Sequence, residues 1–411
     1  MLVASLLKQL VRVGTLDVVD ARGRSHRFSG KPGPSAAIRF HDRATEARML
    51  WNPRLVVGEA YMDGRLTIEH GTLYDFLDLL AINQEFGEAS PPPILRVLDA
   101  VSYVWRRLAQ SNDPLRARRN ASHHYDLSSK LYELFLDSDR QYSCAYFGHD
   151  DDLERAQLRK KQHIARKLLL KPGQRVLDIG CGWGGLALLL ASEADVEVLG
   201  ITLSVEQQAA ATRRAEAAGL AHKVRFELRD YRAVEGTFDR IVSVGMFEHV
   251  GLPNYDRFFD QVRKLLKPDG IALLHAIGRS DGPGATNAWL RKYIFPGGYS
   301  PALSEVLPAV EQARLFVTDI EVLRLHYART LAAWRQRFDA NRAAIAQLYD
   351  ERFCRMWEFY LIGSELAFRR QGHMVWQMQM AREVDTVPLT RDYIYERGSE
   401  PRAMMSNASA A

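Results

Sequence analysis

The segment RVLDIGCGWGGLAL (residues 175–188) begins as an apolar run and continues as a helical pattern, with a glycine cluster between the two. An apolar run of this length is typical of a buried strand. Gly180, Gly182 and Gly184 would let the backbone turn tightly and approach a ligand, and Asp178 on the strand is expected to order that turn. The segment therefore predicts a strand, a ligand-binding turn and a helix, and the residues around it must identify the ligand.

Strand-like and helix-like segments alternate from about residue 150 onward. This alternation predicts an α/β fold in which helices cover both faces of a parallel sheet. Ligands of such sheets lie beyond the carboxyl ends of the strands, so the glycine turn, Asp230, Glu248 and His275 should meet at one crevice. The predicted strands are 175–180, 196–202, 224–228, 238–245 and 270–278, and the helices between them carry the sequences GGLALLLASE, SVEQQAAATRRAEAAG and YDRFFDQVRKLLKP.

Polar residues after the second and third predicted strands indicate the kind of ligand. A dinucleotide site would place an acidic residue where this chain has Thr202, and the chain has no phosphate-binding G-K-[ST] motif. It offers instead Thr202, Glu206 and Gln207 after the second strand, and Asp230 beside Tyr231 after the third. Hydroxyl and amide groups with a stacking ring suit an adenosine that carries an amino acid.

Composition sets outer limits on the function. The chain has 411 residues, of which 47% are hydrophobic, so it can bury ordinary cores. The net charge is only +5, and arginines cluster locally in RRLAQSNDPLRARR (106–119), which suits an anionic membrane surface, nucleic acid or water alike. Three cysteines without a C-x-x-C pair predict neither disulfides nor a metal site and fit a reducing cytosol. No apolar run reaches membrane-spanning length.

The amino-terminal part carries no catalytic pattern. TLDVVD and LTIEH alternate as strands do, TLYDFLDLLAIN predicts a helix, and GEAYMDG (58–64) is typical of a turn between them. After SPPP (90–93), an apolar helical face accompanied by arginines predicts a basic linker helix.

Several longer motifs resemble one family. HHYDLSSKLYELFLD, QYSCAYF, LKPGQRVLDIGCGWGGLA, ITLSVEQ, FDRIVSVGMFEHVG, LKPDGIALLHAIG and KYIFPGGY follow in order between about residues 120 and 300, and YARTLAAW and ERFCRMWEFYL follow later. On these motifs the chain resembles S-adenosylmethionine-dependent methyltransferases and, within them, the cyclopropane fatty acid synthase family. The resemblance implies a Rossmann-like class I methyltransferase fold, with a seven-stranded, mostly parallel sheet and helices on both faces, plus a smaller amino-terminal α+β domain.

The resemblance also implies a reaction. A methyl group passes from S-adenosylmethionine to a cis double bond in an acyl chain of a membrane phospholipid, a carbocation forms, and a proton leaves the new methyl group as the ring closes. In the family a bicarbonate ion takes that proton. The positions that match its bicarbonate site are Cys144, Glu248, His275, Ile277 and Tyr327. Spacing agrees in part, because His275 and Ile277 lie two apart on one strand and so share a face.

The residues predicted to bind the cofactor come partly from the sequence motifs and partly from the family resemblance. The reaction also needs aromatic side chains near the double bond, since their faces stabilise a developing cation. The predicted cofactor-binding residues are Tyr142, Ser143, Asp178, Gly180, Gly182, Gly184, Thr202, Leu203, Gln207, Asp230 and Tyr231. The aromatic candidates are Tyr142, Tyr146, Phe147, Trp289, Tyr293 and Phe295.

The predicted organisation is a lipid-docking or dimerisation domain (1–90), a basic linker helix (91–120), the catalytic domain (121–400) and a disordered tail (401–411). The expected partner is unsaturated phospholipid rather than nucleic acid. The enzyme is expected on the inner face of the bacterial cytoplasmic membrane as a peripheral protein, with a homodimer as a further expectation. One alternative stays open: a fatty acyl C-methyltransferase performs the same alkylation but yields a methyl-branched or methylated unsaturated chain without ring closure.

Overall fold

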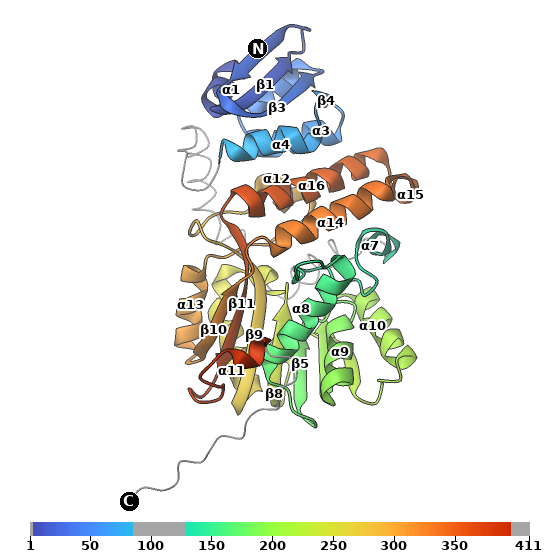
Figure 1. Cartoon of the computed structure of the whole chain (residues 1–411), viewed down its shortest axis with the longest axis vertical. Coiled ribbons are helices and arrows are strands. Elements are labelled where there is room, and N and C mark those ends of the chain that lie inside the picture. The colour runs from blue at the N-terminus through green and yellow to red at the C-terminus, as the bar shows by residue number, and fades with distance from the viewer. Residues whose placement is uncertain (1–2, 85–128, 396–411) are drawn as a thin grey trace, which may run out of the picture.

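The computed structural model describes residues 3–84 and 129–395, which form two sheets and the helices around them (Figure 1). The predicted linker helix (91–120), with Arg106, Arg107, Arg116, Arg118 and Arg119, lies outside these residues, as does the predicted tail (401–411). None of the helices in the described ranges combines the length and the apolar character needed to cross a membrane.

The large sheet has seven strands in the order β10-β11-β9-β8-β5-β6-β7. The β9, β8, β5, β6 and β7 strands run parallel, and β11 lies antiparallel between β9 and β10. This architecture confirms the predicted class I methyltransferase fold, and all five predicted strands are present. The strands are β5 Arg175–Ile179, β6 Glu197–Thr202, β7 Val224–Leu228, β8 Phe238–Val244, β9 Leu266–Arg279, β10 Phe316–Val322 and β11 His373–Ala381.

Helices cover both faces of this sheet and extend beyond one end of it (Figure 1). Strand β5 is buried at four of its five positions, as expected for a central strand covered on both sides. The helices are α7 Ser129–Phe135, α8 Leu153–Leu168, α9 Gly185–Ala194, α10 Val205–Ala217, α11 Tyr255–Leu265, α12 Ala288–Tyr293, α13 Leu303–Gln312, α14 His326–Ala340, α15 Arg342–Leu348, α16 Glu351–Arg370 and α17 Asp392–Tyr395.

The amino-terminal part is the predicted α+β unit, with a four-stranded sheet in the order β2-β1-β3-β4. Alternating burial along β1 matches the alternation in its sequence, and a capping box between Thr72 and Asp75 starts α4. Its elements are α1 Ala4–Leu10, β1 Val13–Val19, β2 Ser25–Ser29, β3 Lys31–Phe40, α2 Arg43–Met49, α3 Pro53–Met62, β4 Leu66–His70 and α4 Leu73–Ile82.

The turn predicted at 58–64 is wrong over most of its length. Helix α3 begins at Pro53, capped by Asn52, and continues through Gly58 to Met62. Gly58 is needed for packing rather than for turning, because a Cβ added there would lie 2.5 Å from the ring of Trp289. A strong amino-terminal cap with proline in the first turn therefore outweighs one glycine in the helix.

Helix α16 joins the two parts, lying between α4 and α14 (Figure 1). Ile362 and Leu366, one turn apart on α16, are buried in the hydrophobic core of the amino-terminal unit. At the neighbouring contact, the Glu59 carboxylate of α3 accepts hydrogen bonds from Lys292 Nζ at 2.6 Å and from the Tyr293 hydroxyl at 3.0 Å. Apolar burial and polar bonds thus fix the small domain against the side of the catalytic domain that bears α12 and α16.

Candidate active site

Two cavities lie at the carboxyl ends of the parallel strands, one of about 170 Å³ and one of about 830 Å³. The glycine turn and Asp230 line the smaller cavity, whereas Glu248 and His275 line the larger one. The single crevice expected from the sequence is therefore divided in two. The cavities share four wall residues, so they meet at one place: Tyr142, Ser143, Gly245 and His249.

The smaller cavity gathers nearly all of the residues predicted to bind the cofactor. Gly184 and Glu206 are absent from its wall. Gly184 instead allows close packing, because an added Cβ would lie 2.7 Å from the ring of Phe226. The predicted residues that do line the cavity are Tyr142, Ser143, Asp178, Gly180, Gly182, Thr202, Leu203, Gln207, Asp230 and Tyr231.

Backbone hydrogen bonds order the glycine turn. The N–H groups of Gly180 and Cys181 both donate to the carbonyl of Ile201, at 2.9 and 3.0 Å. Gly182 has φ +53°, and a Cβ added there would meet no described atom within 4 Å, so the turn is open beside the cavity. The backbone bonds thus do the ordering that the sequence assigned to Asp178.

Asp178 has an unmet hydrogen-bonding requirement. Its side chain is 2% exposed, and its Oδ2 accepts no hydrogen bond from the residues that the structure describes. Burial raises the pKa of Asp178 to about 7. A buried carboxylate without a donor is costly, so this cavity wall fits a ligand that carries a cationic or N–H group. The amino group of S-adenosylmethionine is a group of this kind.

The remaining polar residues of the smaller cavity are partly engaged with each other. The Thr202 hydroxyl donates to Gln207 Oε1 at 3.0 Å, and the guanidinium of Arg232 donates to both oxygens of Asp230, at 2.8 and 2.6 Å. Tyr231 is packed edge-to-face on Phe258. These contacts fix the positions of the side chains before any ligand binds.

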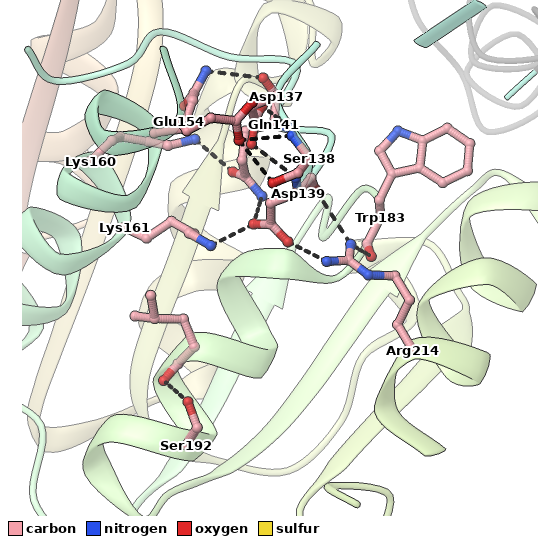
Figure 2. Close-up of polar contacts among 12 residues, drawn as sticks. Asp137, Ser138, Asp139, Gln141, Glu154, Lys160, Lys161, Trp183, Ser192 and Arg214 are labelled. Atoms are coloured by element: carbon pink, nitrogen blue, oxygen red, sulfur yellow. Dashed lines mark hydrogen bonds and ion pairs between the residues drawn. The ribbon is translucent and has the colours of Figure 1, made fainter. Parts of the chain in front are cut away.

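The segment that leads to Tyr142, Ser143 and Cys144 is anchored by α8 and by Arg214 of α10, and Figure 2 shows the contacts to Asp139 and Gln141. Lys161 and Arg214 both bind the carboxylate of Asp139. Lys160 Nζ donates to Gln141 Oε1 at 2.6 Å and to the Ser143 hydroxyl at 2.8 Å. This anchoring holds the wall at which the two cavities meet.

Glu248 lies just past β8 and is 8% exposed. Its Oε1 accepts a hydrogen bond from the Ile277 N–H at 2.6 Å, and its Oε2 has no donor among the described residues. Burial raises the pKa of Glu248 to about 7, which the bond from Ile277 opposes. Glu248 therefore presents one fixed oxygen and one unpartnered oxygen, and it can gain or lose a proton near neutral pH.

His275 on β9 is paired across the sheet with Gln377 on β11. Gln377 Nε2 lies 3.1 Å from His275 Nδ1, and when this amide donates to Nδ1 the ring proton of His275 lies on Nε2. Burial lowers the pKa of His275 to about 3. The imidazole is therefore neutral and acts as a hydrogen-bond donor at the cavity.

Cys144 and Tyr327 complete the predicted catalytic group, and both line the larger cavity. Cys144 is fully buried, its thiol donates to the Ala145 carbonyl at 3.3 Å, and burial raises its pKa. The thiol thus stays protonated and is no nucleophile. Tyr327 on α14 packs against Trp334 and Phe368. The structure brings all five predicted catalytic residues to one cavity.

The aromatic candidates separate into two groups. Tyr142, Trp289 and Phe295 line the larger cavity, whereas Tyr146, Phe147 and Tyr293 do not. Tyr146 instead stacks between His163 and His326, with ring centroids 4.2 and 4.7 Å away. Its packing partners, rather than a substrate, account for its position.

Three further residues were not identified from the sequence. The Tyr360 hydroxyl shares a 2.8 Å hydrogen bond with that of Tyr142. Its motif ERFCRMWEFYL was recognised, but nothing in the motif marks that tyrosine. Lys160 and Gln377 appear in no motif, and only the folded contacts to Ser143 and His275 reveal them.

Comparison with known proteins agrees with this geometry. The family model of mycolic acid cyclopropane synthetase matches residues 112–378. The chain is 41% identical over 350 residues to the cyclopropane-fatty-acyl-phospholipid synthase of Escherichia coli (strain K12), covering 85% of this chain and 89% of that protein. It is 36% identical over 371 residues to the tuberculostearic acid methyltransferase of Mycobacterium tuberculosis, covering 86% of each.

A solved structure extends the comparison. The mycolic acid cyclopropane synthase CmaA1, crystallised with S-adenosylhomocysteine and CTAB, superposes with a TM-score of 0.61 at 34% identity, covering 64% of this chain and 97% of that one. The family model, the long sequence match and this structure all indicate the same class of enzyme. The chain belongs to the mycolic acid cyclopropane synthetase family and is an S-adenosylmethionine-dependent methyltransferase.

Proposed function

We propose that the enzyme converts a cis double bond in an acyl chain of a membrane phospholipid into a cyclopropane ring, with S-adenosylmethionine as the donor of the added carbon. One observation carries the proposal: Glu248, a buried carboxylate with one oxygen unpartnered among the described residues, lines a cavity that meets the cofactor cavity at Tyr142 and His249. When bound, S-adenosylmethionine supplies an electrophilic methyl group. An alkene is a weak nucleophile, so the protein must position it and exclude water.

The walls of the larger cavity suit a developing cation on the acyl chain. Tyr142, Trp289, Phe295 and Tyr360 line the cavity, and aromatic faces can stabilise positive charge without forming a bond. The protonated Cys144 thiol is a poor nucleophile, so it does not trap the cation. The cation then survives long enough to lose a proton from the new methyl group.

We assign the immediate proton acceptor to a bicarbonate ion. Three groups suit it: the neutral His275 can donate from Nε2, the Tyr327 hydroxyl can donate, and Glu248 Oε2 can accept from the hydroxyl of the ion. The N–H of Ile277, one of the positions that match the family's bicarbonate site, donates to Glu248. Its role in the proposal is therefore to hold Glu248 in place.

Removing bicarbonate tests this assignment. In buffer that has been degassed and kept free of carbon dioxide, we expect turnover to fall by about 10-fold or more, because a positioned base contributes at least that much. Added bicarbonate should restore the rate, while the affinity for S-adenosylmethionine stays constant by calorimetry. An unchanged rate would assign proton removal to Glu248 itself.

The phospholipid substrate implies contact with a membrane. In this proposal the enzyme works as a peripheral protein on the inner face of the bacterial cytoplasmic membrane. The basic linker is expected to contribute by attraction to anionic headgroups. Formation of a homodimer stays a prediction.

The product itself tests the function. The purified enzyme is incubated with S-adenosylmethionine and vesicles of cis-monounsaturated phospholipid. The masses of the methyl esters of the acyl chains are then measured by mass spectrometry before and after mild hydrogenation. We expect each modified chain to gain one CH₂ and to take up no hydrogen, since the double bond has become a ring. If the modified chains do take up hydrogen, the enzyme is a fatty acyl C-methyltransferase.

A further inference from the structure

The larger cavity does not end at the catalytic residues. From Glu248 and His275 its wall continues along α16 and reaches α1, β3 and α4 of the amino-terminal domain. At about 830 Å³ it falls in the size range of sites that enclose a small molecule, about 300–1,000 Å³. A polar reaction centre and an extension into a second domain therefore form one continuous space.

The extension is apolar where it enters the amino-terminal domain. Leu7, Phe40, Phe76 and Leu77 line it and are at most 8% exposed. The one buried amide in this wall, Asn83, is satisfied by backbone groups, because it donates to the carbonyls of Val13 and Leu79 and accepts from backbone N–H groups. The other polar wall residues of this domain, Arg54 and Gln84, are only partly buried. Among the residues that the structure describes, this region offers contact to hydrocarbon and no unmet polar group.

Helix α16 forms the side of the cavity between these two regions. Tyr360, Gly363, Ser364 and Ala367 lie at helical spacing and all line it, and Gln371 lines it just past the end of the helix. Tyr360 marks the end nearest the cofactor, through its bond to the Tyr142 hydroxyl. The small residues continue from there for about 10 Å, at a rise of about 1.5 Å per residue.

Gly363 keeps space open rather than allowing a protein contact. Glycine in a helix interior costs about 1 kcal/mol relative to alanine, so its presence calls for a reason. At Gly58 the reason is the neighbouring ring of Trp289. At Gly363 a Cβ would meet no described atom within 4 Å. The helix therefore presents bare backbone to the cavity at this position.

We infer that this extension binds the methyl-terminal half of the substrate acyl chain, and that Gly363 limits how long that half can be. The inference rests on the proposed function. The direction follows from polarity: the headgroup requires water or polar partners, which the Arg279, Asp281 and Asn287 end of the cavity offers. The apolar wall supplied by Leu7 and Phe76 suits the methyl end. The amino-terminal domain thus contributes part of the substrate site.

The test compares Gly363→Leu with the matched control Gly363→Ala on vesicles of two phospholipid series. In the first, the double bond stays at one distance from the carboxyl group while the methyl-side segment grows from five to eleven carbons. In the second, the methyl side is constant and the carboxyl side grows. Each series is assayed as S-adenosylhomocysteine released, and cofactor affinity is measured for each variant.

We expect the wild type and Gly363→Ala to modify the whole first series. Gly363→Leu should stay within about twofold on the shortest methyl side and fall by about 10-fold or more on the longest, because one methylene in a filled pocket is worth about that factor. It should show no length preference in the second series. An equal loss across the first series, or a preference in the second, would overturn the inference while leaving the proposed function intact. No modified lipid from the wild type would refute both.

Discussion

Glu248→Gln is expected to lower kcat/KM by about 10²–10⁴-fold, the usual contribution of a positioned proton-transfer group. Glutamine keeps the acceptor oxygen for the Ile277 N–H, so the local fold is preserved. The glutamine side chain cannot ionise, however, so it cannot act as the base itself. It also cannot offer a charged oxygen to accept the hydroxyl of a bound bicarbonate ion and so orient that ion. S-adenosylhomocysteine release from phospholipid vesicles measures the loss.

The pH profile gives a second readout for the same variant. The pKa of Glu248 is raised to about 7, so the ionised form gains population as the pH rises through that value. Wild-type kcat/KM should therefore increase up to about pH 7 and then level off, and this limb should be missing in Glu248→Gln. The matched control is Glu216→Gln, at an exposed position of α10, which should behave as wild type. An active glutamine variant with an unchanged pH limb would remove Glu248 from the chemistry.

Asp178→Asn is expected to weaken the binding of S-adenosylmethionine by about 10- to 100-fold, since a hydrogen bond to a charged group is worth about 1.5–3 kcal/mol. Oδ2 of Asp178 lacks a donor among the described residues, and the amino group of the cofactor is the partner that we assign to it. Titration calorimetry measures the affinity. Asp195→Asn, at the far end of α9, is the control because that side chain is exposed and pairs with Lys223.

Asp178→Asn, which is expected to weaken cofactor binding, should increase the stability of the folded protein. The pKa of Asp178 rises from 3.8 to about 7 on folding, so the unfolded chain ionises first as the pH rises. Wild-type stability without cofactor should fall as the pH rises from about 4 to about 7 and then level off. The asparagine side chain does not ionise, so Asp178→Asn should gain in melting temperature relative to the wild type over that interval. Equal affinity together with equal pH dependence would show that Asp178 is a satisfied structural residue.

The parallel half of the large sheet could be predicted from sequence because its strands are apolar runs bounded by turns. β5 to β9 all appear where the pattern indicated. β10 and β11 were not predicted, because β11 is placed beside β9 by pairing across about a hundred residues, and β10 in turn pairs with β11. Gln377 was missed for the same reason: it meets His275 only once β11 aligns with β9.

Site residues that lie in recognised motifs could be predicted from the sequence. Site residues whose position depends on contacts between distant segments were harder to predict. Cys144 and Tyr327 come from distant segments, and only the resemblance brought them together in advance. Local pattern failed at Gly58, where packing on Trp289 explains the residue better than a turn does. It also failed to show that the Ile277 N–H is occupied by Glu248, since a backbone donor has no signature in sequence.

The central claim is that the proton lost during the reaction comes from the transferred methyl group. The most direct measurement uses S-adenosylmethionine with a fully deuterated methyl group and counts the deuterium atoms in the modified acyl chain by mass spectrometry. Ring closure predicts that two of the three deuterium atoms remain, because one leaves with the base. Retention of all three would mean that the proton came from elsewhere on the chain, and would contradict the account.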